Sequence, residues 1–285
     1  MEATTRAHVR ASMFALASVA AMVAVLIPQS AIGATVLIDD VTMTGPGPTT
    51  WDAQNGGANS CNTTDIYTPV NDGVFGAQTD AFDGGLALNV EGTDFLDADE
   101  NGDLVGNTLT VGSQTISGVK VWRTDRVLAS SPTMRSLIKF KNPTTGPVRL
   151  TVLWDSNLGS DSSEEVRASA NGDTTYALGD RWVVSSDDAV TPADPVLTFV
   201  TFGKRADVRP DTIVDTFTSG CFGVELTLKV KARSTKYLLF FTQMNGTNEA
   251  AISRAAKFNR VRTGSKLLVD LPTKVLNKIS NWSFA

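Results

Sequence analysis

Apolar and polar residues alternate along two stretches of the chain, 148–154 and 224–230. Alternation with a period of two is typical of a β-strand with one face toward a core and the other toward solvent. A second apolar stretch adjoins each of them across a short segment rich in turn residues, which predicts two hairpins. The predicted hairpins comprise residues 134–141 with 148–155, and 222–231 with 236–243. Further short strands are predicted at 35–42, 86–91, 117–124, 164–170, 181–186 and 197–202. Many short strands separated by turns indicate an all-β fold, an antiparallel β-sandwich.

Helical periodicity occurs only toward the end of the chain. Residues 248–258 are rich in good helix formers, and Asn248 is able to cap their start. Pro272 opens a second short helix, in which apolar residues between 275 and 282 share one face. We expect these short C-terminal helices to cover an edge or an end of the sandwich. Because the sequence contains no internal repeat and no long linker, we expect residues 35–285 to form a single domain.

The start of the chain has the three-part pattern of a secretory signal peptide. Basic residues among the first ten give a positive start, an uncharged apolar run occupies 11–27, and small residues follow at 31–34. We therefore expect residues 1–34 to be a cleaved signal peptide. The mature chain would then be secreted or located in the cell envelope, without a membrane span. An uncleaved N-terminal anchor is the alternative, although the apolar run is slightly shorter than the ~20 residues that cross a membrane.

Export limits the chemistry that the mature chain can perform. His8 is the only histidine, and it lies in the predicted signal peptide. Ser-His-Asp hydrolysis, Cys-His proteolysis and His-ligated zinc, copper or iron sites all require an imidazole. The sequence therefore excludes these chemistries for the mature chain.

The two cysteines, Cys61 and Cys221, both belong to the predicted mature chain. In an oxidising compartment we expect such a pair to form a disulfide. Two unpaired buried thiols are the alternative, because the sequence does not give the Cα separation that a bridge requires.

Charge is unevenly distributed along the chain. The formal net charge of −5 argues against a nucleic acid as the partner. Residues 35–119 contain no lysine or arginine, and 13 acidic residues occur from Asp39 to Asp103, whereas 11 basic and three acidic residues occur from Glu225 onward. Solvated faces explain such runs in many proteins. Otherwise, the basic C-terminal part packs against the acidic segment, or divalent cations neutralise it.

One segment, residues 97–103, resembles the first half of a calcium-binding loop. Asp97, Asp99, Asn101 and Asp103 supply side-chain oxygens at alternate positions, and the sixth position is a glycine. Position twelve is a threonine rather than the glutamate that an EF-hand needs, so a complete EF-hand is rejected. The motif predicts either a looser calcium loop of the kind found in extracellular domains or an acidic turn between strands.

Two further loops are rich in side-chain oxygens. The candidate residues are Asp155, Asn157 and Asp161 after the strand at 148–155, and Asp187 and Asp188 after the strand at 181–186. Carboxylates and hydroxyls at strand ends are able to bind a cation or sugar hydroxyls. Aspartate turns and hydrogen-bonded serine or threonine loops explain the same residues equally well.

Several short motifs occur in a fixed order between residues 130 and 284. They are Asn142-Pro-Thr, Trp154-Asp-Ser-Asn-Leu-Gly-Ser-Asp161, Gly172-Asp-Thr, Asp180-Arg-Trp182, Ser185-Ser-Asp-Asp188, Leu238-Leu-Phe-Phe-Thr-Gln243 and Asn281-Trp282. The series resembles a group of uncharacterised bacterial secreted or surface β-sandwich modules. The resemblance implies an exported bacterial protein with a sandwich fold, and it implies no catalytic residues.

Two functions fit these observations. The first is a secreted or cell-surface binding or structural module without catalysis, stabilised by the disulfide and by calcium, with a glycan or a protein as its extracellular ligand. The second is a carbohydrate-active hydrolase or lyase with paired carboxylates, which needs no histidine. An enzyme should place several acids in one cleft beside exposed aromatic residues, and Trp51 is the expected exposed aromatic.

Overall fold

The computed structural model describes residues 33–217 and 219–284, except the side chains of residues 58–60. The predicted signal peptide, residues 1–34, falls almost entirely outside the described residues. Within the described residues, no helix combines the length and the apolar composition that crossing a membrane requires.

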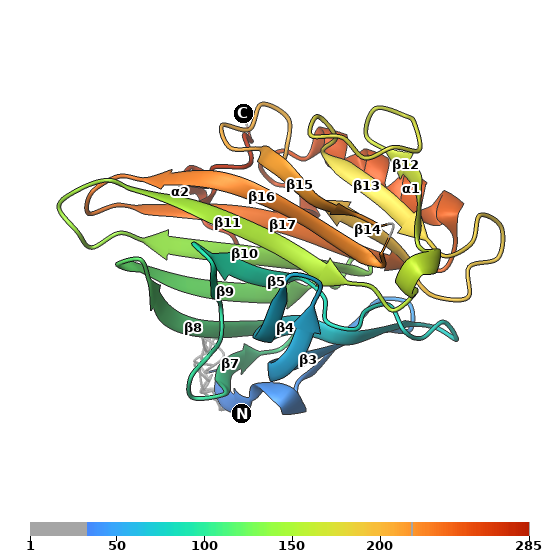
Figure 1. Cartoon of the computed structure of the whole chain (residues 1–285), viewed down its shortest axis with the longest axis horizontal. Helices are drawn as coiled ribbons and strands as arrows, with labels where there is room; N and C mark the ends of the chain where they lie inside the picture. The colour runs from blue at the N-terminus through green and yellow to red at the C-terminus, as the bar shows by residue number, and fades with distance from the viewer. Residues whose placement is uncertain (1–32, 218, 285) are drawn as a thin grey trace, which may run out of the picture. The chain divides into compact units, whose positions relative to one another are not determined.

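Two large antiparallel sheets and one small one build the fold, which confirms the predicted β-sandwich (Figure 1). In spatial order, the nine-stranded sheet contains β1 (Ala34–Leu37), β7 (Asn101–Val105), β8 (Thr108–Ile116), β9 (Val119–Val127), β10 (Thr133–Lys141), β17 (Thr235–Asn245), β14 (Val196–Val200), β13 (Trp182–Ser186) and β12 (Glu165–Ser169). The five-stranded sheet contains β15 (Pro210–Thr216), β16 (Cys221–Val230), β11 (Val148–Asn157), β5 (Ala87–Val90) and β6 (Thr93–Asp94). The small sheet contains β2 (Thr42–Gly45), β3 (Thr49–Ser60) and β4 (Thr63–Phe75).

The strands of the two predicted hairpins exist, but the predicted pairing is wrong. Strand β10 pairs with β17 in one sheet, while β11 pairs with β16 in the other. The connections β10–β11 and β16–β17 therefore cross from one sheet to the other (Figure 1). Asn142 joins the two connections, because its backbone N–H donates to Ser234 O at 3.0 Å and its side chain donates to Val230 O and Lys231 O.

Aromatic side chains from both large sheets meet in the core between them. Trp154 of β11 stacks on Phe240 of β17 with ring centroids 4.4 Å apart, and Phe222 of β16 stacks on Phe199 of β14 at 4.2 Å. The small sheet contributes Trp51 and other buried residues to the same core. These stacked rings and the other buried apolar side chains of the shared core hold the two sheets together.

A charged pair lies inside this core. Arg123 and Asp125 are both fully buried and form an ion pair with Nε 2.8 Å from Oδ2. The hydroxyls of Tyr67 and Ser136 donate to the same carboxylate, and the guanidinium lies over the Trp154 ring at 4.7 Å from its centroid. Because every partner is supplied internally, the pair is compatible with complete burial.

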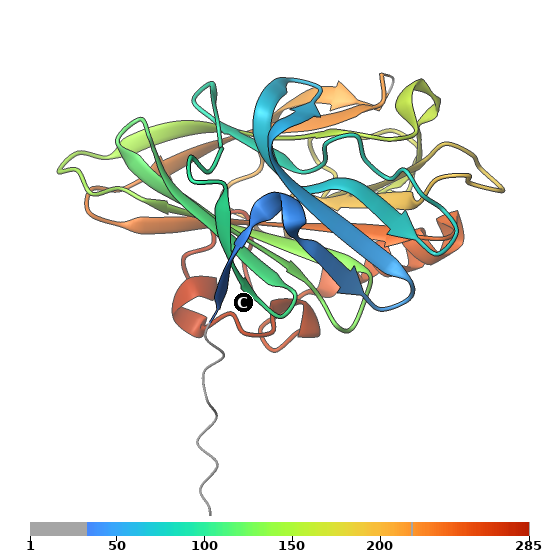
Figure 2. The ribbon, with the colours of Figure 1, turned by 90° about the horizontal axis from the view of Figure 1, so that it is seen from below.

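The C-terminal helices cover a face of the nine-stranded sheet rather than an edge or an end of the sandwich (Figure 2). Helix α1 (Asn248–Ala255), helix α2 (Thr273–Leu276) and the 3₁₀ helices Ala256–Arg260 and Lys266–Leu268 follow β17. Phe241 of β17 contacts Phe258 and Trp282 of this C-terminal segment, with ring centroids 5.2 and 5.4 Å away. Helix α1 is capped by Thr247, one residue before the predicted Asn248, through a hydrogen bond from Ala250 N.

The predicted disulfide between Cys61 and Cys221 is confirmed, with a Cα–Cα distance of 5.9 Å. It links the β3–β4 turn to the first residue of β16. Thus it ties the small sheet to the five-stranded sheet across a sequence separation of 160 residues.

Candidate functional site

The predicted calcium segment, residues 97–103, comprises the end of the β6–β7 connection and the first three residues of β7. Asp97, Asp99 and Asn101 line a cavity of about 390 Å³ together with residues of β8. Both carboxylate oxygens of Asp97 are engaged by the backbone, since they accept from Asp99 N at 3.0 Å and from Gly112 N at 3.1 Å. The first bond is that of an acidic turn, and the second ties this turn to β8.

Asp103, the fourth predicted ligand, does not line this cavity. Its carboxylate accepts from the hydroxyl of Thr35 on the neighbouring strand β1, at 3.4 Å. In the part of the chain that the structure describes, no group of three or more histidine, cysteine, aspartate or glutamate residues is placed to hold a metal ion. Calcium binding at residues 97–103 therefore stays a prediction.

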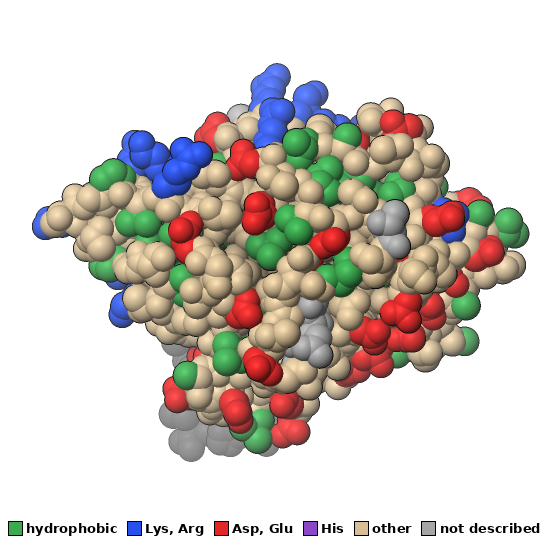
Figure 3. Space-filling model, viewed as in Figure 1, with side chains coloured by type: hydrophobic (Ala, Val, Ile, Leu, Met, Phe, Trp, Pro, Cys, Tyr) green, Lys and Arg blue, Asp and Glu red, His purple; other side chains and the backbone are tan. Residues whose placement is uncertain are grey.

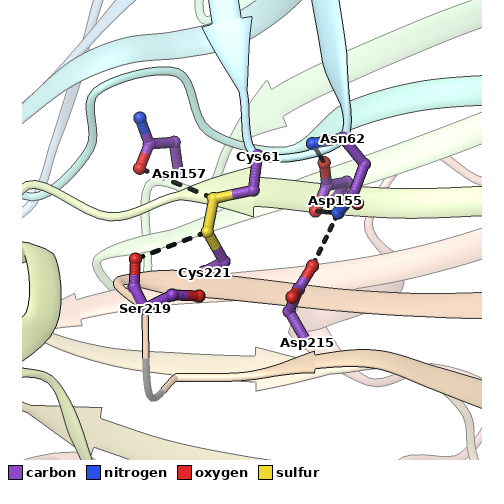
Figure 4. Close-up of a disulfide and its surroundings, with 7 residues drawn as sticks. All are labelled: Cys61, Asn62, Asp155, Asn157, Asp215, Ser219 and Cys221. Atoms are coloured by element: carbon purple, nitrogen blue, oxygen red, sulfur yellow. Dashed lines mark hydrogen bonds between the residues drawn. A yellow bond between two sulfur atoms is a disulfide. The ribbon is translucent and has the colours of Figure 1, made fainter.

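The three candidate residues at 155–161 are separated, because Asp155 and Asn157 end strand β11 while Asp161 begins the 3₁₀ helix Asp161–Ser163. Asp155 is buried beside the disulfide, where it accepts from Asn62 N at 2.9 Å and from the Asn62 side chain at 3.2 Å (Figure 4). Asn62 also donates to Asp215 of β15 at 2.6 Å. Asn157 lies on the other side of the disulfide, with Oδ1 3.6 Å from Cys61 Sγ. Asp155 thus holds the β3–β4 turn in place through its hydrogen bonds with Asn62, while half-buried Asn157 contacts the disulfide.

Asp187 and Asp188 follow β13, and they have different surroundings. Asp188 accepts from Val190 N at 2.7 Å and from Thr191 N at 2.8 Å, and these hydrogen bonds lower the pKa of its carboxyl. It therefore organises a turn. Asp187 accepts from Ala193 N through Oδ2, whereas its buried Oδ1 has no hydrogen-bond partner among the described residues.

The structure gathers Asp187 and Asp161 with other acids into one group at the loops beyond β4, β11 and β13. We call this group the acidic loop cluster, and its members are Asp80, Asp83, Asp161, Glu164, Asp187 and Asp194. Burial and then the neighbouring carboxylates raise the pKa of the Asp80, Asp83 and Asp194 side chains. Burial raises the pKa of Glu164 to about 7. Acidic side chains gather at this end of the molecule in Figure 3. The sequence contained these residues, but only the fold brings them together.

A second site was missed by the sequence analysis: a cavity of about 540 Å³ beside the C-terminal helices. Four basic residues line it, namely Arg254, Lys257, Arg260 and Lys266. None of the four forms an ion pair with a described residue, and no aspartate or glutamate lines the cavity. We call it the basic cavity. The basic bias of the chain after Glu225 was its only signal in the sequence.

The walls of the basic cavity also offer polar and apolar groups. Gln243 of β17 is only 3% exposed, its Nε2 donates to Thr133 at 2.8 Å, and its Oε1 has no partner in the described part of the chain. The Thr133 hydroxyl also shares a hydrogen bond with the Ser131 hydroxyl at 2.7 Å, and Ser131 lines the cavity. Phe75 and Phe258 supply apolar wall.

Arg135 holds one wall of the basic cavity. It is buried beneath the segment 266–269 and donates to Leu267 O at 3.3 Å and to Val269 O at 2.7 Å. Burial lowers its pKa to about 10, so the side chain remains cationic at neutral pH and adds to the positive potential nearby.

The expected exposed aromatic residue, Trp51, is fully buried in the core, so that prediction is wrong. It lies on β3, where its side chain faces inward. The tryptophan that retains exposure is Trp122 of β9, and the Nζ of Lys139 lies 4.0 Å from its ring centroid.

Comparison with known proteins identifies no family. No protein-family model matches the chain, and a search of curated proteins finds no match. Among solved structures, the Slr1438 protein from Synechocystis sp. PCC 6803 is 8% identical with a TM-score of 0.42, over 70% of this chain and 92% of that one. A polysaccharide lyase is 12% identical with a TM-score of 0.42, over 71% of this chain and 34% of the lyase. The heparan sulfate lyase HepC from Pedobacter heparinus is 8% identical with a TM-score of 0.40, over 70% of this chain and 33% of the lyase. This chain therefore spans about a third of either lyase. Likeness at this level does not indicate what the chain binds.

Proposed function

We propose that the protein is an exported, non-catalytic binding module that takes an acidic carbohydrate in the basic cavity. The observation that carries the proposal is a concave site with four cations that have no anionic partner in the described part of the chain. Concave sites with a few convergent polar groups are where small ligands usually bind. A disulfide agrees with an extracellular location.

Each part of the cavity matches one part of an acidic sugar. Arginine and lysine side chains bind carboxylate or sulfate groups. The free Oε1 of Gln243 and the serine hydroxyls can accept from or donate to sugar hydroxyls. Phe75 and Phe258 offer apolar surface to the C–H groups of a sugar ring.

The position of the acids supports binding over catalysis. Glycoside cleavage by paired carboxylates needs two acids on either side of the scissile bond. The basic cavity has no acid in its lining. Glu164 has the raised pKa of a general acid, but its side chain is buried with 2% exposure and cannot touch a polysaccharide.

Calorimetric titration with defined oligosaccharides tests the proposal. A carboxylated oligogalacturonate and a sulfated heparin oligosaccharide should bind, and neutral cello-oligosaccharides should not. The double variant Lys257→Ala/Arg260→Ala should weaken binding about 10-fold, which is roughly 1.4 kcal/mol. Lys274→Ala on α2, outside the cavity, is the matched control and should leave affinity unchanged. Equal binding of the neutral oligosaccharide, or an equal loss in the Lys274 variant, would refute the proposal.

A further inference from the structure

A smaller cavity, of about 240 Å³, adjoins the basic cavity. Arg260 and Val261 line both cavities, so the two are neighbours on one surface. We call the smaller one the adjoining cavity. Its cationic lining residues are Lys204, Arg205, Arg260 and Arg262. Among the described residues, no aspartate or glutamate lines it, and none of its four cations forms an ion pair.

The segment 257–262 contributes to both cavities, and hydrogen bonds hold it in place. Oδ1 of Asn259 accepts from Arg181 Nη2 at 2.6 Å and from Trp182 Nε1 at 3.2 Å. The neighbouring side chains of Arg260 and Arg262 are exposed. A ligand would therefore meet cations on a backbone that is already ordered, which lowers the entropic cost of binding.

The other cations of the adjoining cavity belong to the β14–β15 connection. Gly203 packs closely against the C-terminal segment: its N–H donates to Asn281 O at 2.8 Å, and a Cβ at this position would lie 2.3 Å from the Trp282 ring. A glycine permits this approach, which sets Lys204 and Arg205 beside the C-terminal segment. Figure 3 shows basic side chains at the top of the molecule, where Figure 1 places the C-terminus.

The two cavities together concentrate positive charge on one surface. They present seven different cations, because Arg260 is common to both sets of four. A ligand with a single acidic group would leave most of these charges uncompensated, and like charges held together oppose the compact state. Several acidic groups on one molecule would compensate them.

We infer that the ligand is an acidic polysaccharide that binds along its chain across both cavities, an inference that rests on the proposed function. Acidic groups repeated along one chain reach successive cations at a high effective concentration, so each added contact strengthens binding. Asn259 and Ser283 of the adjoining cavity offer polar groups to sugar hydroxyls. Among the described residues, no aromatic side chain on which a base could stack lines this cavity, which favours a sugar polymer over a single-stranded nucleic acid.

A comparison of ligand lengths tests the inference. Calorimetry measures the affinity of the full chain for digalacturonate and for octagalacturonate. The octamer should bind about 100-fold more tightly, which is more than the larger number of dimer positions along an octamer provides. A thymidine oligonucleotide with the same number of charges should bind more weakly than the octamer.

Two charge-matched variants locate the contact. Lys204→Ala/Arg262→Ala removes exposed cations of the adjoining cavity alone and should weaken octamer binding about 10-fold, while digalacturonate, held in the basic cavity, changes by less than about two-fold. Lys229→Ala/Lys231→Ala removes the same charge outside both cavities and should leave both affinities unchanged. Unaltered thermal midpoints show that both variants fold.

The outcomes separate this inference from the proposed function. If both lengths bind with similar affinity, if the two double variants lose octamer affinity equally, if Lys204→Ala/Arg262→Ala weakens both lengths equally, or if the oligonucleotide binds more tightly, the inference is overturned while an acidic sugar in the basic cavity still stands. If neither galacturonate binds, both are overturned.

Discussion

Removing the disulfide should strongly destabilise the protein. The bridge joins residues separated by 160 positions. For a closed loop of that length, the chain-entropy relation gives about 17 cal/mol/K, or about 5 kcal/mol at 25 °C. Native disulfides typically contribute about 2–5 kcal/mol, so we expect the double variant Cys61→Ala/Cys221→Ala to lose about 3–5 kcal/mol.

Guanidinium unfolding, followed by tryptophan fluorescence, measures this loss. The m-value should also rise in the double variant, because its denatured chain is less compact and exposes more surface on unfolding. Dithiothreitol should lower the stability of the unaltered protein and leave that of the double variant unchanged. A loss below 1 kcal/mol would refute the entropic reasoning. It would mean that the hydrogen bonds of Asn62 to Asp155 and Asp215 fix the β3–β4 turn without the bridge.

Three further predictions concern buried polar groups. First, the pKa of Glu164 is raised from 4.5 to about 7, so the folded state binds the extra proton between these values. In EDTA, the free energy of unfolding should therefore fall by about 3 kcal/mol as pH rises from 4.5 through 7. The variant Glu164→Gln leaves the neighbouring charges of Asp187 and Arg167 in place. It should remove most of this pH dependence in denaturant titrations. Second, Asp125→Ala leaves Arg123 buried without its anion and should lower the free energy of unfolding by about 3–5 kcal/mol. The double variant Arg123→Met/Asp125→Leu should recover much of this loss. Equal stabilities of the single and double variants would contradict this prediction. Third, Asn281 is fully buried; its side chain accepts from Leu239 N and donates to Leu239 O and Thr201 O, each at 2.8 Å. Asn281→Ala should therefore lower the free energy of unfolding by about 2–4 kcal/mol, measured by thermal unfolding. A change within about 0.5 kcal/mol would show that these hydrogen bonds contribute little.

The alternation of residues along the chain predicted where strands lie, but it did not predict how they pair. Leu150 and Leu228 face the core in either arrangement, so a hairpin and a crossing between sheets leave the same pattern. The β10–β11 connection crosses between the sheets, and Asn142 fixes it there by donating to the end of β16 and to the β16–β17 connection, 88 residues or more away. A pattern read over a short stretch of sequence does not predict a partner so far away.

The run 238–241 is apolar at every position and therefore does not alternate. Leu238 and Phe240 face the core between the sheets, while Leu239 and Phe241 face the C-terminal helices. A strand that is apolar at every position is buried on both faces. That argument would have placed the helices on a face of the sheet from the sequence alone.

The motifs between residues 130 and 284 describe the architecture rather than a site. Asn142, Asp155, Asp180 and Asn281 are all buried, and each bonds the backbone of a distant or turning segment. The acidic loop cluster and the basic cavity consist of other residues. Glu164 and Asp187 meet through sheet register, and the basic cavity combines β4, β17 and the C-terminal segment, so neither site forms a local pattern.

The structure keeps charges of opposite sign apart. None of the ion pairs among the described residues joins the acidic segment 35–103 to the basic residues after Glu225; the one pair that spans a long stretch, Arg126 with Asp270, lies elsewhere. Packing of the basic C-terminal part against the acidic segment stays a prediction of the sequence, although Phe75 of that segment lines the basic cavity beside the C-terminal basic residues. Like charges held together lower stability unless an outside ion compensates them. A basic cavity without acids in its lining therefore favours an anion.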